Sequence, residues 1–184
     1  MNSYARRRLA LAPHVFAEGE NEIWVNDVHS QPNRTRIREL LKPRNTDELA
    51  EIVRSASGKG LPISVSGCRH SMGGQQFAAD SNCFDTRELD RVISFDRERG
   101  LLEAEAGIQW PKLICAYLDA QADETKQWSV AQKQTRADTF TLGGSLSSNV
   151  HGRGLRMKPL ISDIESFTLI NADGKSICCS RRGK

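Results

Sequence analysis

The sequence predicts an α+β fold made of two subdomains. Short apolar segments with strand character alternate with two stretches of helical periodicity, and two pairs of strands are joined by tight turns. Two glycine-rich segments, residues 66–76 and 139–152, lie far apart in the chain and fit a ligand held between two subdomains. The 184 residues are enough for a packed core. We assign residues 1–35 to a polar, irregular lead segment and residues 36–184 to one domain.

The first half of this domain reads as strand, helix, strand and loop. Arg36–Lys42 has the apolar content of a strand, and Pro43 ends it. Thr46 is the expected N-cap of a helix that ends at Gly58 or Gly60. The helix is indicated by apolar side chains at helical spacing, namely Leu49, Ile52, Val53 and Ala56. The buried strand Leu61–Val65 then leads into the first glycine-rich segment.

The second half begins with a further apolar patch at Asn82–Asp85. Val92–Phe95 and Leu101–Glu105 predict a hairpin, and Trp110–Ala120 predicts a helix with Pro111 in its first turn. A last hairpin is expected from Ile164–Asn171 and Ser176–Ser180. Because the chain stops there, we expect the second subdomain to be incomplete and the chain to be the N-terminal portion of a larger protein.

Composition argues against several classes of protein. The net charge of +3 lies largely at the two ends, and the mixed charges between them argue against nucleic acid as a partner. The five cysteines form no paired Cys-x-x-Cys units, so we expect reduced thiols and no zinc. The N-terminus lacks a signal core, and no window approaches the ~20 apolar residues of a membrane span. The expected location is therefore the cytoplasm.

The first glycine-rich segment, Ser66–Gln76, is the most informative stretch. It places His70 in a glycine-spaced turn after a strand, where backbone N–H groups can approach a phosphate. Taken alone, this segment is equally compatible with a ligand site and with a plain turn. The second segment, Leu142–Gly152, adds small side chains, hydroxyls and unhindered amides. Together the two segments indicate a nucleotide-like cofactor.

Common alternatives are disfavoured by spacing. Neither segment matches the Walker A or the Rossmann glycine pattern. His29, His70 and His151 lack the short spacing that would preorganise a metal site, so no metal is expected.

The combined motifs resemble a known family. They are, in order, Lys42-Pro43, Thr46–Leu49, Ser66-Gly67, His70-Ser71, Gly73–Gln75, Ala106-Gly107, Leu142–Gly144 and His151-Gly152. This order resembles the PCMH-type FAD-binding domain of the vanillyl-alcohol oxidase family, in particular its carbohydrate and sugar-lactone oxidase branch. The resemblance extends from Arg36 to about Ser180 and implies the two-subdomain PCMH-type fold, truncated at the C-terminus. The resemblance, and not the composition, implies that the cofactor is FAD.

The resemblance also implies positions for the cofactor contacts. In the first segment these are Gly67, Cys68, Arg69, His70, Ser71 and Gln75, where the turn would wrap the pyrophosphate with its amides. In the second segment they are Asp138, Gly143, Gly144, Ser147, Asn149, His151 and Gly152. His70 matches the histidine that is often bonded to the flavin 8α-methyl group, and the alternative is a hydrogen-bonded imidazole beside dissociable FAD. Arg136, Ala137 and Asp138 stand where some relatives carry a second, cysteine tether, so we expect one link at most.

The implied reaction is oxidation of a CH–OH group in a sugar, polyol or lactone-like small molecule, with hydride transfer to flavin N5. No catalytic base is identified, since in the family it comes largely from a substrate domain that would follow. Two alternatives stay open. One is a flavin- or nucleotide-binding module without turnover, and the other is an interaction protein whose glycine loops are only turns.

Overall fold

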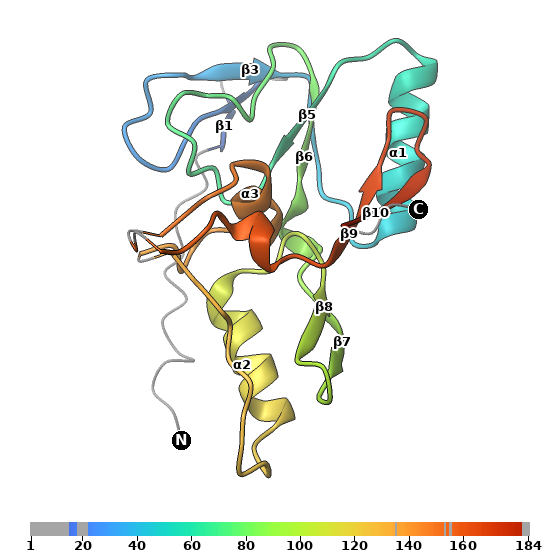
Figure 1. The fold of residues 1–184 in the computed structure, drawn as a ribbon. Coiled ribbons are helices and arrows are strands. Elements are labelled where there is room, and N and C mark those ends of the chain that lie inside the picture. The colour runs from blue at the N-terminus through green and yellow to red at the C-terminus, as the bar shows by residue number, and fades with distance from the viewer. Residues whose placement is uncertain (1–14, 18–21, 135, 153, 155, 182–184) are drawn as a thin grey trace.

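The computed structural model describes residues 15–17, 22–134, 136–152, 154 and 156–181, and it confirms the α+β class (Figure 1). The strands are β1 (Val15–Ala17), β2 (Ile23–Val25), β3 (Thr35–Ile37), β4 (Glu39–Leu41), β5 (Ile63–Ser66), β6 (Asn82–Asp85), β7 (Val92–Asp96), β8 (Leu101–Ala104), β9 (Ser166–Ile170) and β10 (Ser176–Ser180). The helices are α1 (Thr46–Gly58), α2 (Trp110–Ala120) and α3 (Leu142–Ser147), with short 3₁₀ turns η2 (Thr86–Glu88) and η3 (Leu160–Asp163).

A small parallel sheet supports the first glycine-rich segment. Its strand order is β4-β6-β5, and all four residues of the central strand β6 are buried. Burial on both faces is typical of parallel strands, which explains the uninterrupted core character of Phe84 and Cys83. Strand β5 ends at Ser66, so the first segment begins at the carboxyl edge of this sheet.

The predicted single strand Arg36–Lys42 is wrong. The structure divides it into β3 and β4, which belong to different sheets. The break is at Arg38, whose backbone N–H donates to the carbonyl oxygen of Ser81 at 2.8 Å. This hydrogen bond to a residue distant in sequence ends β3 and starts β4 in another sheet. The apolar pattern of residues 36–42 continues across the break and does not mark it.

Helix α1 begins one residue away from the expected cap. Asn45, not Thr46, is the N-cap, and its side-chain oxygen accepts a hydrogen bond from the N–H of Glu48 at 2.8 Å. Both residue types cap helices well, so local preference did not separate them. The helix ends at Gly58 as predicted.

The segment before residue 36 is not simply irregular. β1, β2 and β3 form an antiparallel sheet in which Ile23 pairs with Ile37. Val25 and Ile37 pack against Cys83 and so join this sheet to the parallel one. The division of the chain at residue 35 stays a prediction. The irregular character assigned to the lead segment is wrong for strand β2 and for Thr35, and it is confirmed for residues 26–34.

The other half of the molecule is built on α2 and the β7–β8 hairpin, both of which confirm the sequence prediction. Their buried cluster contains Ile108, Trp110, Leu113, Ala137 and Leu160. It is separate from the Val25 cluster of the first half. Figure 1 shows α3 between the two halves. Two hydrophobic cores with glycine-rich segments between them agree with the two-subdomain fold.

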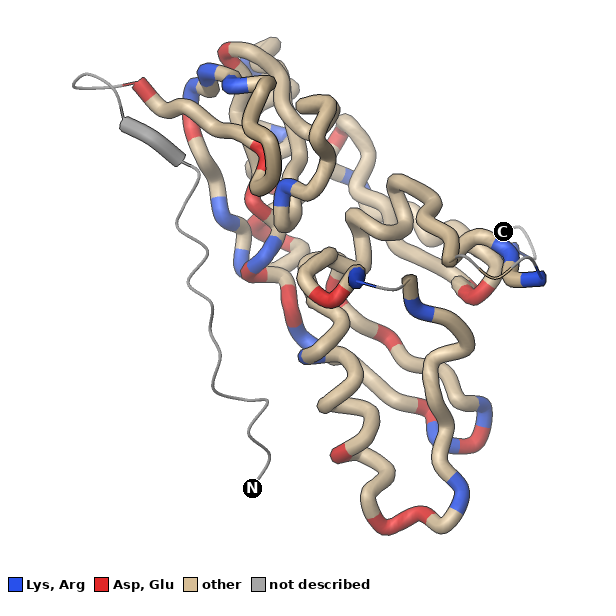
Figure 2. The backbone as a smooth tube through the Cα atoms, turned by 90° about the vertical axis from the view of Figure 1, so that its left-hand side faces the viewer, with Lys and Arg blue, Asp and Glu red and all other residues tan. Residues whose placement is uncertain are grey.

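The last hairpin, β9–β10, pairs with Ile170 opposite Ser176 and lies against α1. Its turn is fastened by the Arg54 Nη1 atom, which donates to the carbonyl oxygen of Gly174 at 3.1 Å. Basic and acidic residues are interspersed along the described chain in both halves (Figure 2). Among the described residues, no helix has the length and apolarity needed to cross a bilayer.

Candidate cofactor site

The turn after β5 buries two of its side chains and leaves several of its backbone N–H groups without an acceptor among the described residues. Cys68 and Arg69 are buried, and Arg69 has a left-handed backbone with φ of 58°. Within the part of the chain that the structure describes, the backbone N–H groups of Cys68, His70 and Ser71 donate no hydrogen bond. Clustered amides of this kind are suited to an anion such as a phosphate.

The second segment is more ordered than the sequence predicted. A loop was expected over Thr139–Asn149, but residues 142–147 form helix α3. Thr141 caps it, because its hydroxyl oxygen accepts from the N–H of Gly144 at 3.2 Å. The N–H of Gly143 donates to the carbonyl oxygen of Ala106 at 2.7 Å. The amides of this glycine pair are therefore occupied within the protein.

The structure brings the two segments together. A Cβ atom added at Gly67 would overlap the Thr141 side chain, so glycine allows this close approach. Gln109 joins the segments, since its Nε2 donates to the Thr139 carbonyl oxygen at 2.7 Å and to the Cys68 Sγ at 3.1 Å. The third link is a hydrogen bond of 2.9 Å between Thr139 Oγ1 and His70 Nε2.

His70 sits in a half-buried cluster at this junction. Its Nδ1 lies 3.1 Å from Nε2 of His29, and its ring centroid is 4.4 Å from that of Phe140. Burial, followed by repulsion from His29, holds the pKa of His70 below its ordinary value of 6.5, while a hydrogen bond to the Thr139 backbone opposes the shift. The imidazole is therefore neutral at neutral pH. No group of three or more metal-ligating side chains gathers among the described residues.

Cys68 faces the interior beneath the same turn. Burial raises the pKa of its thiol to about 11, well above the usual 9.0, and nearby Arg87 opposes that shift. A thiol that stays protonated at neutral pH is a poor nucleophile. Its side chain therefore supports the turn from below.

The remaining predicted contacts are less concentrated. Ser71 accepts from Gln76 Nε2 through its carbonyl oxygen at 3.1 Å, and Asp138 forms an ion pair of 2.6 Å with Lys133. Several predicted residues are exposed, namely Gln75, Asp138, Gly144, Ser147, Asn149 and His151. No contact between described residues joins these side chains to His70, and their roles stay predictions.

Sequence reasoning missed several residues of this junction. They are Asp27, His29, Gln109, Thr139, Phe140, Thr141 and Ser145. His29 was considered only as a metal ligand, and its contact with His70 spans 41 residues. Ser145 is fully buried, and its hydroxyl has no hydrogen-bond partner among the described residues. A buried hydroxyl of this kind in a segment of ligand-binding character is the signal that the structure adds.

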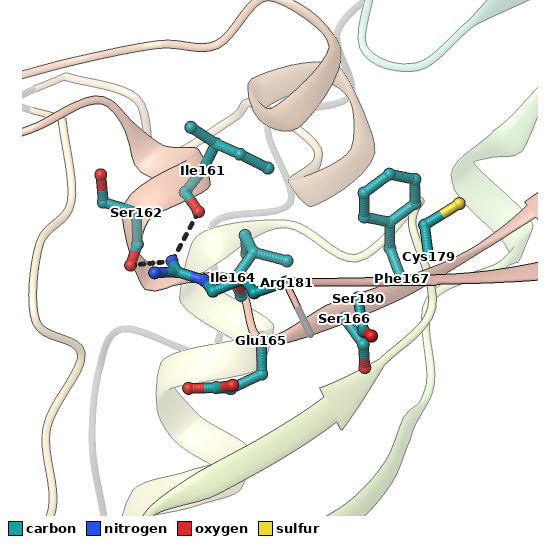
Figure 3. Close-up of a pocket in the computed structure, with 9 residues that line it drawn as sticks. All are labelled: Ile161, Ser162, Ile164, Glu165, Ser166, Phe167, Cys179, Ser180 and Arg181. Carbon is teal, nitrogen blue, oxygen red and sulfur yellow. Dashed lines mark hydrogen bonds between the residues drawn. The ribbon is translucent and has the colours of Figure 1, made fainter. Parts of the chain in front are cut away.

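A separate shallow groove lies at the open end of the β9–β10 hairpin (Figure 3). It has a volume of about 340 Å³, and Arg181 crosses it to donate to the carbonyl oxygens of Ile161 and Ser162. Its lining contains none of the residues predicted to hold the cofactor.

The fold and the junction define a nucleotide-cofactor domain of PCMH type, and comparison with known proteins gives its family. A family model described as "FAD binding domain" matches residues 38–180. The chain belongs to this family of FAD-binding domains, which is the PCMH-type domain of the vanillyl-alcohol oxidase family.

Three similar proteins illustrate the match. L-gulonolactone oxidase from Scyliorhinus torazame is 27% identical over 165 residues, covering 86% of this chain and 33% of the relative. L-gulono-1,4-lactone dehydrogenase from Mycobacterium tuberculosis is 26% identical over 142 residues, covering 77% and 31%. A solved alkyldihydroxyacetonephosphate synthase has a TM-score of 0.65 at 18% identity, over 77% of this chain and 28% of that one. The chain spans about a third of the length of the curated relatives it matches.

The residues at the junction fit FAD. The amides of the first turn suit a pyrophosphate, and the glycine at position 67 allows the first turn to lie close to Thr141 of the second segment. The unpartnered Ser145 hydroxyl provides a further polar group in the second segment.

Proposed function

We propose that the chain is the FAD-binding portion of a flavin-dependent oxidoreductase that oxidises a CH–OH group in a sugar, polyol or lactone-like substrate. One observation carries this proposal: the two glycine-rich segments meet at His70, which links to the second segment through Thr139. The names of the L-gulonolactone oxidase and the L-gulono-1,4-lactone dehydrogenase support the substrate class.

The residues divide the task between them. The N–H groups of Cys68, His70 and Ser71 would hold the pyrophosphate, and the second segment, whose glycine amides are bonded within the protein, would support the ring system. When bound, FAD supplies the hydride acceptor at N5. Thr139 and Phe140 fix the plane of the His70 ring beside it.

We also propose that His70 carries the flavin through a covalent bond. Its lowered pKa supports this role, because a neutral ring keeps a lone pair for bond formation. Such an N–C bond would replace one imidazole N–H and one C–H of the 8α-methyl group, with release of two protons. Bound FAD would supply the acceptor for the two electrons, with dioxygen as the final oxidant. One of the two ring hydrogen bonds of His70 must be exchanged in the process.

Reconstitution of the purified chain with FAD tests the cofactor and the bond together. We expect a flavin visible spectrum and flavin fluorescence that stays with acid-precipitated protein. His70→Ala is expected to release all flavin on precipitation, while the exposed Lys126→Ala control retains it. Acid-stable flavin in His70→Ala would refute the bond, and colourless folded protein would refute cofactor binding.

Substrate oxidation is tested on the full-length protein. Anaerobic addition of polyols and sugar lactones is expected to bleach the flavin absorbance near its visible maximum. A full-length protein that binds FAD but is bleached by none of them would be a binding module without turnover.

A further inference from the structure

A loop from the N-terminal sheet is fastened to the His70 turn on both sides. This loop, residues 26–34, connects β2 to β3. The N–H of Val28 donates to the carbonyl oxygen of Arg69 at 3.0 Å, and Asn33 Nδ2 donates to that of Met72 at 2.7 Å. The two bonds flank His70, so the loop is held in register with it.

The loop is internally braced. Buried Asp27 accepts hydrogen bonds at Oδ1 from the N–H groups of His29 at 2.8 Å and Gln31 at 3.3 Å, while Asn26 Nδ2 donates to the Gln31 carbonyl oxygen at 2.7 Å. Burial alone raises the pKa of Asp27, but hydrogen bonds from backbone N–H groups outweigh it and lower the pKa overall. The Asp27 carboxylate is therefore charged at neutral pH and holds the loop through these hydrogen bonds.

The loop delivers one ring to His70. His29 Nε2 lies 3.1 Å from His70 Nδ1, and the two ring centroids are 5.1 Å apart. His29 lies outside residues 38–180, the range of the family match. The contact therefore belongs to a segment of this chain that the family match leaves undescribed.

A neutral imidazole has one N–H and one lone pair, so its two neighbours decide which nitrogen carries the proton. On the Nε2 side the neighbour is the Thr139 hydroxyl, which can donate or accept. On the Nδ1 side it is His29 Nε2, which accepts when the His29 proton is on its other nitrogen and donates when it is not. Both contacts are satisfied when hydrogen bonds run from Thr139 through His70 to His29, and also when they run in the reverse direction.

We propose that His29 is a positioning residue that accepts the Nδ1 proton of His70 and so keeps the lone pair on Nε2, facing Thr139 and the second segment. That the Nε2 lone pair faces a flavin rests on the proposed function. The tautomer of His70 does not depend on that function, because it is measured in protein without cofactor.

The test is ¹⁵N NMR of histidine-labelled protein without FAD. In the unchanged chain we expect a pyridine-like Nε2 and a protonated Nδ1 for His70. In His29→Ala, the Nε2–H form becomes populated and the His70 pKa rises toward 6.5, because burial and repulsion by His29 both decrease. His29→Gln, whose amide oxygen can accept, restores the Nδ1–H form.

A control separates positioning from general structure. Ser30→Ala changes the exposed neighbour in the same loop, so it should leave the His70 signals unchanged. An unchanged tautomer and pKa in His29→Ala would overturn the proposal. A protonated Nε2 in the unchanged chain would also overturn the proposal. That measurement does not depend on whether any variant folds.

The flavin experiment is kept separate. Given the proposed covalent bond, His29→Ala should lower the acid-stable fraction several-fold at equal total FAD. If the chain binds no FAD but shows the expected tautomer, the proposed function fails and the positioning role stands. If FAD binds but the tautomer is unaffected by His29→Ala, only the positioning role fails.

Discussion

The two glycine-rich segments differ in the use of their backbone amides. In the first, the N–H groups of Cys68, His70 and Ser71 have no acceptor in the described part of the chain. In the second, the N–H groups of Gly143 and Gly144 are both bonded within the protein. Two segments of similar composition thus differ: the backbone N–H groups of the first are available to a ligand, and those of the glycine pair in the second are used within the protein.

The difference has a local cause. The first turn buries the side chains of Cys68 and Arg69, and the N–H groups of Cys68, His70 and Ser71 have no acceptor among the described residues. In the second, the amides of Gly143 and Gly144 at the start of α3 donate to the Ala106 carbonyl oxygen and the Thr141 hydroxyl, and glycine permits close packing against Ala106. We therefore expect the first segment to respond to ligands and the second to respond to packing.

The largest expected effect concerns the inward side chain of the turn. A pKa of about 11 against the usual 9.0 lowers the thiolate fraction of Cys68 about hundredfold, and burial slows reaction further. Alkylation of native protein, followed by peptide mass mapping, should label Cys68 at least that much more slowly than an exposed Ser147→Cys. Equal labelling would mean that the turn does not face inward as described.

A smaller effect is expected from closing the gap between the segments. Gly67→Ala places a Cβ against the Thr141 side chain and should cost about 1–3 kcal/mol of unfolding free energy. The cost should shrink in a Thr141→Ala background, because the overlapping Oγ1 and Cγ2 atoms are gone. Chemical denaturation of the four proteins measures this coupling.

Gly58→Ala is the matched control for that cycle. A Cβ at Gly58 meets nothing within 4 Å, and alanine favours the helix by roughly 0.5–1 kcal/mol. This variant should be as stable as the original chain or more so. Equal destabilisation at both positions would show that the segments do not pack as closely as described.

The smallest expected effect is the pH dependence of stability. Because the folded pKa of His70 lies below 6.5, its contribution is fully present above pH 6.5 and is lost as pH falls through the folded pKa. Denaturation at pH 7.5 and 5.5 should show a larger loss in the unchanged chain than in His70→Asn. An identical loss of unfolding free energy in both proteins would show that protonation of His70 does not destabilise the folded state.

Local signals were sufficient for some elements. Pro111 and the apolar spacing after it fix α2 at the predicted bounds, and Gly100, with φ of 64°, closes the predicted β7–β8 hairpin. These features depend on neighbouring residues. The junction of the two segments was also predicted, because their shared composition and the family resemblance pointed to one ligand.

Other features depend on distant partners. The break at Arg38 needs Ser81, and α3 forms despite two glycines because Thr141 and Ala106 hold its start. His29 reaches His70 only through a loop that Asp27 braces. No local pattern marks these contacts, so sequence periodicity could not predict them.

The central claim is that the first turn binds FAD with its backbone while the second segment supports it. Residue-resolved hydrogen exchange with and without FAD measures this directly. We expect the amides of Cys68, His70 and Ser71 to exchange rapidly alone and to become protected by FAD, with those of Gly143 and Gly144 slow in both states. Unchanged exchange at Cys68, His70 and Ser71 in FAD-loaded protein would contradict the claim.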